Sequence, residues 1–167
     1  MMRYFEPEHI READILAVEK YGLTSLELMK NAGSNAAREI LKRYPDALCF
    51  TILAGPGNNG GDGFVAAKSL LLKGLRVTVI LSSEINAYSG DAKISLDSLI
   101  TLKDSNCTIK LSINLSDREL REISANADCM IDSLLGTGSR GAPRGEVERM
   151  IRECKNNRAV VAFDIPS

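Results

Sequence analysis

Short apolar runs alternate with helical segments along most of this chain, and no other feature restricts its fold as strongly. Strands are expected over residues 47–54, 75–81, 108–111, 129–131 and 159–165. Helices are expected between them over residues 63–73, 89–102, 116–126 and 145–155. Strands that helices of this length separate pair in parallel through right-handed crossovers. The sequence therefore predicts an α/β fold: a Rossmann-like, doubly wound, mostly parallel sheet with helices on both faces.

Two helices are expected before the first strand, as an N-terminal helical prelude. Apolar residues recur at helical spacing over residues 10–21, and Gly22 is suited to end that helix. The segment Thr24–Glu27 has the form of a capping box, and a stripe of small and apolar residues follows as far as Leu41. Small residues in that stripe allow the second helix to pack closely on a neighbour before Pro45 stops it.

Length and charge exclude several classes of protein. The 167 residues suffice for one domain with a proper core and are too few for two ordinary domains. Basic residues number 21 and acidic residues 22, so the formal net charge of −1 gives no general attraction to nucleic acid or to an anionic membrane. No apolar run reaches the roughly 18 residues of a membrane span, and the N-terminal segment lacks the apolar core of a secretory signal.

The cysteines favour neither a metal site nor a disulfide framework. Cys49, Cys107, Cys129 and Cys154 lie far apart, without a C-x-x-C pair, and are expected to be buried, reduced thiols. Such thiols predict a cytoplasmic protein. The single histidine, His9, lies near the start of a helix and is expected at the surface.

Unusual polar segments follow three of the expected strands: residues 55–63, 132–138 and 164–167. In open α/β sheets, ligands bind beyond the carboxyl ends of the strands. Because all three segments fall at that edge, the sequence predicts one shared site there.

The first segment has glycines at the spacing of a dinucleotide-binding fingerprint, Gly55-x-Gly57-x-x-Gly60. Glycines let the backbone approach an anion, and the following helix offers free N–H groups. The segment lacks the Gly-Lys-Ser/Thr ending of a nucleotide triphosphatase loop. Glu84, beyond the second strand, has the chemistry to bind a ribose as in a dehydrogenase.

Polar side chains in these segments suggest both substrate binding and cation binding. Asn58 and Asn59 can grip a substrate through donor and acceptor atoms, whereas Asp62 is either a ligand or a helix N-cap. Asp132, at a strand end, is interpreted either as the cap of a turn or as a ligand or acid–base group. Asn59, Asp132 and Ser167 offer only oxygen ligands, which suit a hard cation rather than zinc.

The second glycine-rich segment, residues 136–142, also precedes a helix. Its glycines and Thr137 can hold a phosphate, with Arg140 or Arg144 supplying positive charge. Asp164 ends the last strand beside Ser167 and is a further candidate for this site.

Three of these segments, residues 57–63, 132–138 and 164–167, resemble the signatures of the YjeF N-terminal domain family. Residues 21–26 and 28–33 are similar to the N-terminal helices of that family. The resemblance spans nearly the whole chain in the right order. It implies NAD(P)HX epimerase activity, which interconverts the two epimers of hydrated NADH or NADPH at the hydrated carbon of the nicotinamide ring. This nicotinamide-nucleotide repair reaction needs no redox step, so the dinucleotide is substrate and not cofactor.

The resemblance also implies the site residues and partners. The hydrated dinucleotide would contact Asn58, Asn59, Gly60, Gly61, Asp62, Gly136, Thr137, Gly138, Ser139, Arg140, Gly141, Ala142 and Asp164. A potassium ion would be coordinated by Asn59, Asp132 and Ser167, and Asp132 is the candidate catalytic acid–base group. The small-molecule substrate is hydrated NADH or NADPH, a homodimer is expected, and a dehydratase is the expected functional partner.

The chain departs from the family at two points. Lys30 stands where the family usually has an acidic residue. The family normally continues past the position of Ser167 through a glycine, further strands and a helix, so residues 1–167 are expected to be a single domain, truncated at its C-terminal end or unusually short. No part of residues 1–167 resembles the dehydratase domain that is commonly fused to the family.

Two other functional classes fit part of the sequence. A non-catalytic nucleotide-binding or protein-interaction module of the same fold has no need of Asn59, Asp132 and Asp164 together. A Rossmann dehydrogenase would leave the Asn-Asn-Gly-Gly-Asp run of residues 58–62 and the second glycine-rich segment unexplained.

Overall fold

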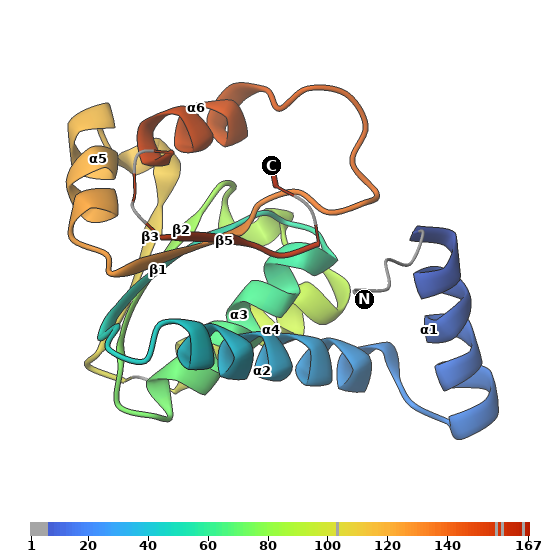
Figure 1. Ribbon diagram of the computed structural model, residues 1–167. Helices are drawn as coiled ribbons and strands as arrows, with labels where there is room; N and C mark the ends of the chain where they lie inside the picture. The colour runs from blue at the N-terminus through green and yellow to red at the C-terminus, as the bar shows by residue number, and fades with distance from the viewer. Residues whose placement is uncertain (1–6, 103, 156, 158, 165) are drawn as a thin grey trace.

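A computed structural model describes residues 7–102, 104–155, 157, 159–164 and 166–167 (Figure 1). The element order is α1 (Pro7–Tyr21), α2 (Ser25–Arg43), β1 (Cys49–Ala54), α3 (Asn58–Leu71), β2 (Arg76–Leu81), η1 (Ile85–Ala87), α4 (Gly90–Thr101), β3 (Cys107–Leu111), η2 (Ser112–Asn114), α5 (Asp117–Ala125), β4 (Cys129–Ser133), α6 (Gly145–Cys154) and β5 (Val160–Ala162). Both expected capping boxes are present, with Thr24 and Ser116 as the N-caps of α2 and α5.

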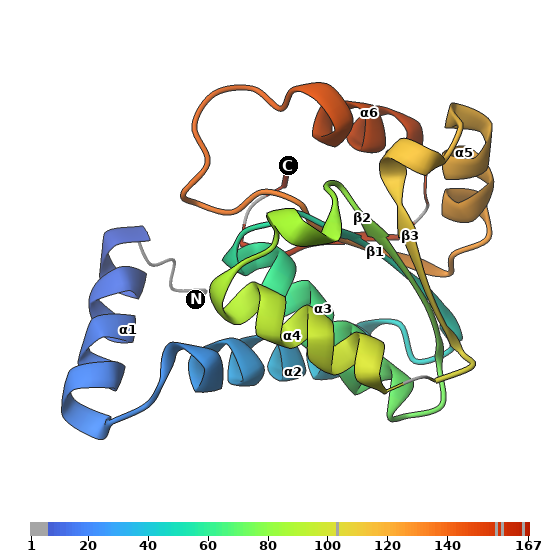
Figure 2. The ribbon, with the colours of Figure 1, turned by 180° about the vertical axis from the view of Figure 1, so that it is seen from behind.

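The five strands form one parallel sheet in the order β3-β2-β1-β4-β5. Helices α2, α3 and α4 cover one face, and α5 and α6 cover the other (Figures 1 and 2). The predicted Rossmann-like, doubly wound α/β fold is therefore confirmed.

Two hydrophobic clusters lie on the two faces of the sheet. The larger is packed under α2, α3 and α4, and includes Phe50, Ile52, Phe64, Leu70 and Leu96. The smaller joins α5 and α6 to the opposite face through Leu53, Ile80, Leu120, Met130 and Met150. Alternate residues of β1 belong to different clusters, because successive side chains of a strand point to opposite faces. A strand buried on both sides reads as a continuous apolar run, as residues 47–54 do.

Two predicted boundaries near the polar strand ends are wrong. Helix α3 begins at Asn58, five residues before the expected start at residue 63. Strand β5 covers only Val160–Ala162, so Asp164 lies beyond the strand end instead of within residues 159–165. The early start of α3 puts residues 58–62 into the first turns of a helix, where N–H groups point toward the carboxyl edge of the sheet.

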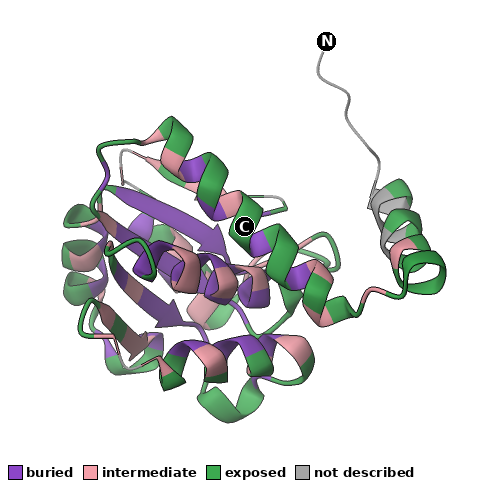
Figure 3. Cartoon of the chain, turned by 90° about the horizontal axis from the view of Figure 1, so that it is seen from below, coloured by how far each residue is buried: buried purple, intermediate pink, exposed green. Residues whose placement is uncertain are grey.

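Helix α1 stands apart from the body of the domain (Figure 3). It ends before Gly22, which has a φ of +67° as a left-handed stop residue requires. Its large apolar side chains Ile15, Leu16, Val18 and Tyr21 are all exposed. The helical spacing predicted this helix correctly, yet the structure leaves much of its apolar surface outside the core.

The cysteines are free thiols, two buried and two half-buried. Burial raises the pKa of both Cys129 and Cys154 to about 11, so both carry their protons at neutral pH. His9 is exposed, as expected. Within the described residues, no helix is both long and apolar enough to cross a membrane.

Candidate functional site

The topological switch point of the sheet lies between β1 and β4. From β1 the chain proceeds outward to β2 and β3, then returns to β4 on the other side of β1. Gly55 follows β1 and donates its N–H to the carbonyl oxygen of Ser133, at the end of β4, over 3.1 Å. Ligands of open α/β sheets bind at such a switch point. Both glycine-rich segments start there.

The glycines of the first segment allow three pieces of backbone to pack together. A β-carbon at Gly55 would lie 1.9 Å from the carbonyl oxygen of Leu134, and one at Gly60 would lie 1.9 Å from the carbonyl oxygen of Gly55. By contrast, nothing lies within 4 Å of the corresponding position at Gly57. Gly55 and Gly60 therefore fix the start of α3 against the β1 and β4 strand ends.

Asn59 is held in the middle of this junction. Its side-chain Nδ2 donates to the carbonyl oxygen of Leu135 at 2.6 Å and to that of Phe163 at 3.4 Å. The residue is only 6% exposed, and its Oδ1 is buried without a hydrogen-bond partner. A buried acceptor without a partner costs about 1–3 kcal/mol, so such an atom indicates a missing ligand.

Asp132 joins the end of β4 to the last described residues. Its side chain is buried, with Oδ2 accepting from the N–H of Ser167 at 2.8 Å and Oδ1 accepting from the N–H of Leu134 at 3.2 Å. The Oγ of Ser167 accepts in turn from the N–H of Leu135 at 3.0 Å. Asn59, Asp132 and Ser167 thus come together around Leu135, as the strand-end pattern predicted.

Asp164 lies at the rim of the same junction in an unfavourable backbone conformation. Its φ of +59° is the only positive value among the described residues other than glycine, and such a conformation costs of the order of 1–3 kcal/mol. A β-carbon at Gly136 would lie 2.9 Å from Oδ2 of Asp164, so a larger residue there would displace this carboxylate. Thr137 N–H also points to that oxygen, at a long 3.5 Å. Strain held in place at a strand end is typical of functional sites.

Not every predicted site residue lies at this junction. Gly136 does, but residues 139–142 are exposed on a loop that swings away from the sheet before turning back to α6 (Figure 1). Arg140 and Arg144 are exposed as well, and their contact with a phosphate stays a prediction. Glu84, the dehydrogenase-like candidate, is exposed at the start of η1.

Asp62 is not a helix N-cap. The N-cap of α3 is Gly57, and Asp62 lies a full turn inside the helix. It lines two neighbouring grooves, and its contact with a ligand stays a prediction. The N-cap interpretation is wrong because residues 58–61 already belong to α3.

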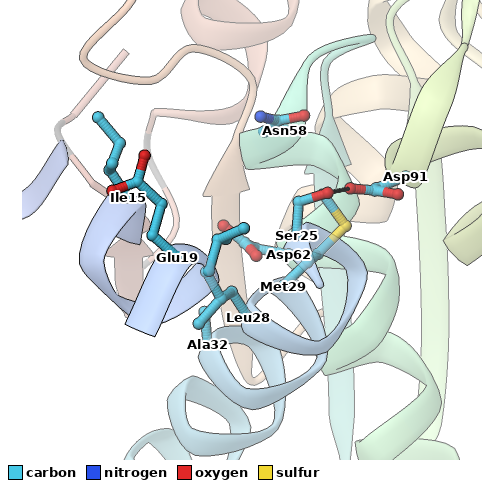
Figure 4. Close-up of a pocket in the computed structure, with 10 residues that line it drawn as sticks. Ile15, Glu19, Ser25, Leu28, Met29, Ala32, Asn58, Asp62 and Asp91 are labelled. Carbon is cyan, nitrogen blue, oxygen red and sulfur yellow. Dashed lines mark hydrogen bonds between the residues drawn. The ribbon is translucent and has the colours of Figure 1, made fainter. Parts of the chain in front are cut away.

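The two grooves lie on the α2 side of the carboxyl edge. The α1 groove, of about 500 Å³, is lined by Ile15, Val18, Glu19, Ser25, Leu28, Met29, Ala32, Asn58, Asp62 and Asp91 (Figure 4). The β5 groove, of about 360 Å³, is lined by Ala32, Ala36, Glu39, Ile40, Arg43, Asp62, Val161, Ala162, Phe163 and Asp164. The two share Ala32 and Asp62, so they meet beside α3.

Sequence reasoning missed several residues of the α1 groove. Ser25 and Asp91 lie in the first turns of α2 and α4, and Ser25 Oγ donates a short hydrogen bond to Oδ2 of Asp91. For Asp91 the available signal was positional, because helices that follow parallel strands begin at the carboxyl edge. Ser25 and Glu19 carried no such signal, since α1 and α2 both precede the first strand.

Residues 25–167 match the protein family described as YjeF-related protein N-terminus. This chain belongs to that family. A YjeF-related relative from Pirellula staleyi, named NAD(P)H-hydrate epimerase, is 37% identical over 171 residues, which cover 100% of this chain and 73% of the relative. A relative from Thermanaerovibrio acidaminovorans, named bifunctional NAD(P)H-hydrate repair enzyme Nnr, is 38% identical and aligns with 98% of this chain, but with only 31% of its own length.

A solved structure has the same fold. The crystal structure of the yeast protein ynu0 matches with a TM-score of 0.81 at 24% sequence identity, over 99% of this chain and 71% of that one. The family model and the relatives confirm the family that the motifs indicated, and the solved structure confirms the fold.

Proposed function

We propose that this chain is an isomerase that interconverts the R and S epimers of hydrated NADH and NADPH. The observation that carries the proposal is the junction at the switch point, where Asn59, Asp132, Asp164 and Ser167 are held together. The proposal also draws on the relatives named NAD(P)H-hydrate epimerase. An epimerase needs proton-transfer groups at a dinucleotide site, and this junction offers two carboxylates beside an α3 N-terminus suited to phosphate.

The residues at the junction fit a potassium ion. Asn59 Oδ1 is the buried oxygen without a partner, and its orientation is fixed because Nδ2 binds two carbonyl oxygens. Asp132 and Ser167 belong to the same junction and would supply further oxygen atoms, since each carboxylate oxygen can accept more than one bond. An all-oxygen set suits a hard cation. Bound there, the ion would supply positive charge beside Asp132 and fix the geometry of the site.

The carboxylates would move the proton that epimerisation requires. Inversion at the hydroxyl-bearing carbon moves a proton either at that carbon or to and from the departing oxygen. In the second route, the C–O bond breaks as the oxygen takes a proton, and it forms again on the opposite face as the proton returns. Buried Asp132 is the candidate acid–base group, and exposed Asp164 is placed to orient the substrate or to act as a second group.

The direct test is epimerisation of chirally resolved hydrated NADH, followed by chromatography of the two epimers. Purified protein in potassium buffer is expected to bring the epimers to equilibrium faster than buffer alone. Tight binding of the hydrated dinucleotide without any acceleration would instead identify a non-catalytic binding module and refute the proposal.

Potassium is expected to raise the melting temperature and the epimerisation rate relative to tetramethylammonium at equal ionic strength. A ligand at about 100 times its Kd stabilises a protein by about 2.7 kcal/mol, which sets the scale of the effect. In Asn59→Ala, the melting temperature and the epimerisation rate should no longer differ between the two salts, because the unpartnered Oδ1 atom is lost.

Asn58→Ala is the matched control for this effect. It makes the same change on the adjacent residue, whose side chain is exposed, and should keep the potassium response in melting temperature. Equal melting temperatures of the unmodified protein in the two salts would refute the ion site.

The described residues fold around one sheet, and we propose that residues 1–167 form a single YjeF-related domain. We propose a dehydratase as its functional partner, in keeping with relatives that are named bifunctional repair enzymes.

A further inference from the structure

We infer that the α1 groove binds the adenosine half of the hydrated dinucleotide, and that Asp91 selects a ribose without a 2′-phosphate. The chain would then prefer hydrated NADH to hydrated NADPH. This inference rests on the proposed function and assigns a substrate preference to the same site.

The groove is built where three helices begin. Ser25, Asn58 and Asp91 lie in the first turns of α2, α3 and α4, and α1 forms the outer wall (Figure 4). The hydrogen bond from Ser25 to Asp91 ties the starts of α2 and α4 together. Its volume of about 500 Å³ lies within the range of small-molecule sites, roughly 300–1,000 Å³.

The apolar lining suits a flat ring. Leu28 and Ala32 of α2 line the groove together with Ile15 and Val18 of α1. Met29 lines it as well, although its buried sulfur accepts a hydrogen bond from Ser95 Oγ at 3.4 Å. An adenine ring in the groove would cover Ile15 and Val18, which are otherwise exposed.

The charge of the lining suits ribose hydroxyls and opposes a phosphate. Glu19, Asp62 and Asp91 are its charged residues, and none of the described lining residues is Lys or Arg. In dinucleotide sites, a carboxylate binds the ribose 2′-hydroxyl, whereas an arginine accommodates a 2′-phosphate. A 2′-phosphate in this groove would form like-charged pairs with these carboxylates, and such pairs at an interface are strongly unfavourable. The lining therefore favours the ribose without a 2′-phosphate.

Continuity with the β5 groove assigns the two halves of the substrate. The β5 groove contains Asp164 and meets the α1 groove at Ala32 and Asp62. The reacting nicotinamide ring must reach the carboxylates at the junction, so it belongs on the β5 side. The pyrophosphate would then pass the N-terminus of α3, and the other nucleoside would lie in the α1 groove.

Binding of adenosine phosphates tests the inference without turnover. By titration calorimetry, AMP is expected to bind at least about tenfold more tightly than adenosine 2′,5′-bisphosphate. In Asp91→Asn, which keeps an oxygen for Ser25, the ratio should fall to within about threefold. Asp97→Asn is the matched control on the same helix, because exposed Asp97 pairs with Lys93 outside the groove and should leave the ratio unchanged.

Three results would overturn the inference: no AMP binding at millimolar concentration, equal affinity for the two probes, or an equal change of the ratio in both variants. Its failure is separable from that of the proposed function. Epimerisation of hydrated NADH and NADPH with equal kcat/KM would leave the function standing and reject the selectivity. Selective AMP binding without epimerisation would leave the selectivity standing and reject the epimerase function.

Discussion

Asp132→Asn is expected to lower the rate of epimerisation of hydrated NADH by at least about a hundredfold, because a positioned acid–base group is lost. The fold should survive at some cost. Both carboxylate oxygens accept backbone N–H groups, from Leu134 and Ser167, and an amide must turn its NH₂ toward one of them. That mismatch costs about 1–3 kcal/mol of stability, so the rate is measured per folded molecule. The assay is run at saturating potassium because Asp132 is also a proposed ligand of the ion.

Asp128→Asn is the control, because it removes a carboxylate that accepts backbone N–H groups but lies away from the site. Asp128 accepts the N–H groups of Leu48 and Cys49, which hold its pKa below the ordinary value, but it does so at the amino edge of the sheet. Its replacement should reduce stability and leave turnover per folded molecule within about twofold. Near-normal turnover by folded Asp132→Asn would remove Asp132 from the mechanism and make Asp164 the next residue to test.

Gly55→Ala is expected to reduce the free energy of unfolding by about 3 kcal/mol or more. The added methyl group would lie 1.9 Å from the carbonyl oxygen of Leu134, and that oxygen belongs to backbone that cannot swing aside. Urea unfolding followed by circular dichroism measures the loss.

Gly57→Ala is the matched comparison, because nothing lies within 4 Å of the added group. It should cost less than about 1 kcal/mol, mainly through the weaker capping ability of alanine. Similar losses in the two variants would mean that the close packing of Gly55 does not hold the junction together.

The sequence predicted the architecture because local signals and the buried strands agree. The apolar run at residues 47–54 and the capping boxes at Thr24 and Ser116 each correspond to an observed element. The start of α3 was missed because glycine and asparagine are poor helix formers. There, tertiary packing overrides propensity, since Gly60 fits against Gly55 and Gly61 against Met29.

The buried part of the candidate site was predictable, and its outer part was not. Asn59 and Ser167 follow parallel strands and Asp132 lies near the end of β4, so the topology places all three at one edge. The carbonyl oxygens of Leu135 and Phe163 left no mark in the sequence, because every residue has one. The α1 groove depends on where α1 stands and on the bond from Ser25 to Asp91, residues 66 positions apart in sequence.

The position of the junction between β1 and β4 also bears on how the protein unfolds. Residues 25–111 supply β1, β2 and β3, whereas residues 112–167 supply β4 and β5. Asn59 comes from the first half, and Asp132 and Ser167 come from the second. A ligand that contacts all three residues would therefore bind residues 25–111 and residues 112–167 to each other. Hydrogen exchange in β4 and β5 should therefore slow together with exchange in β1 when the site is filled, so that the two halves open as one cooperative unit.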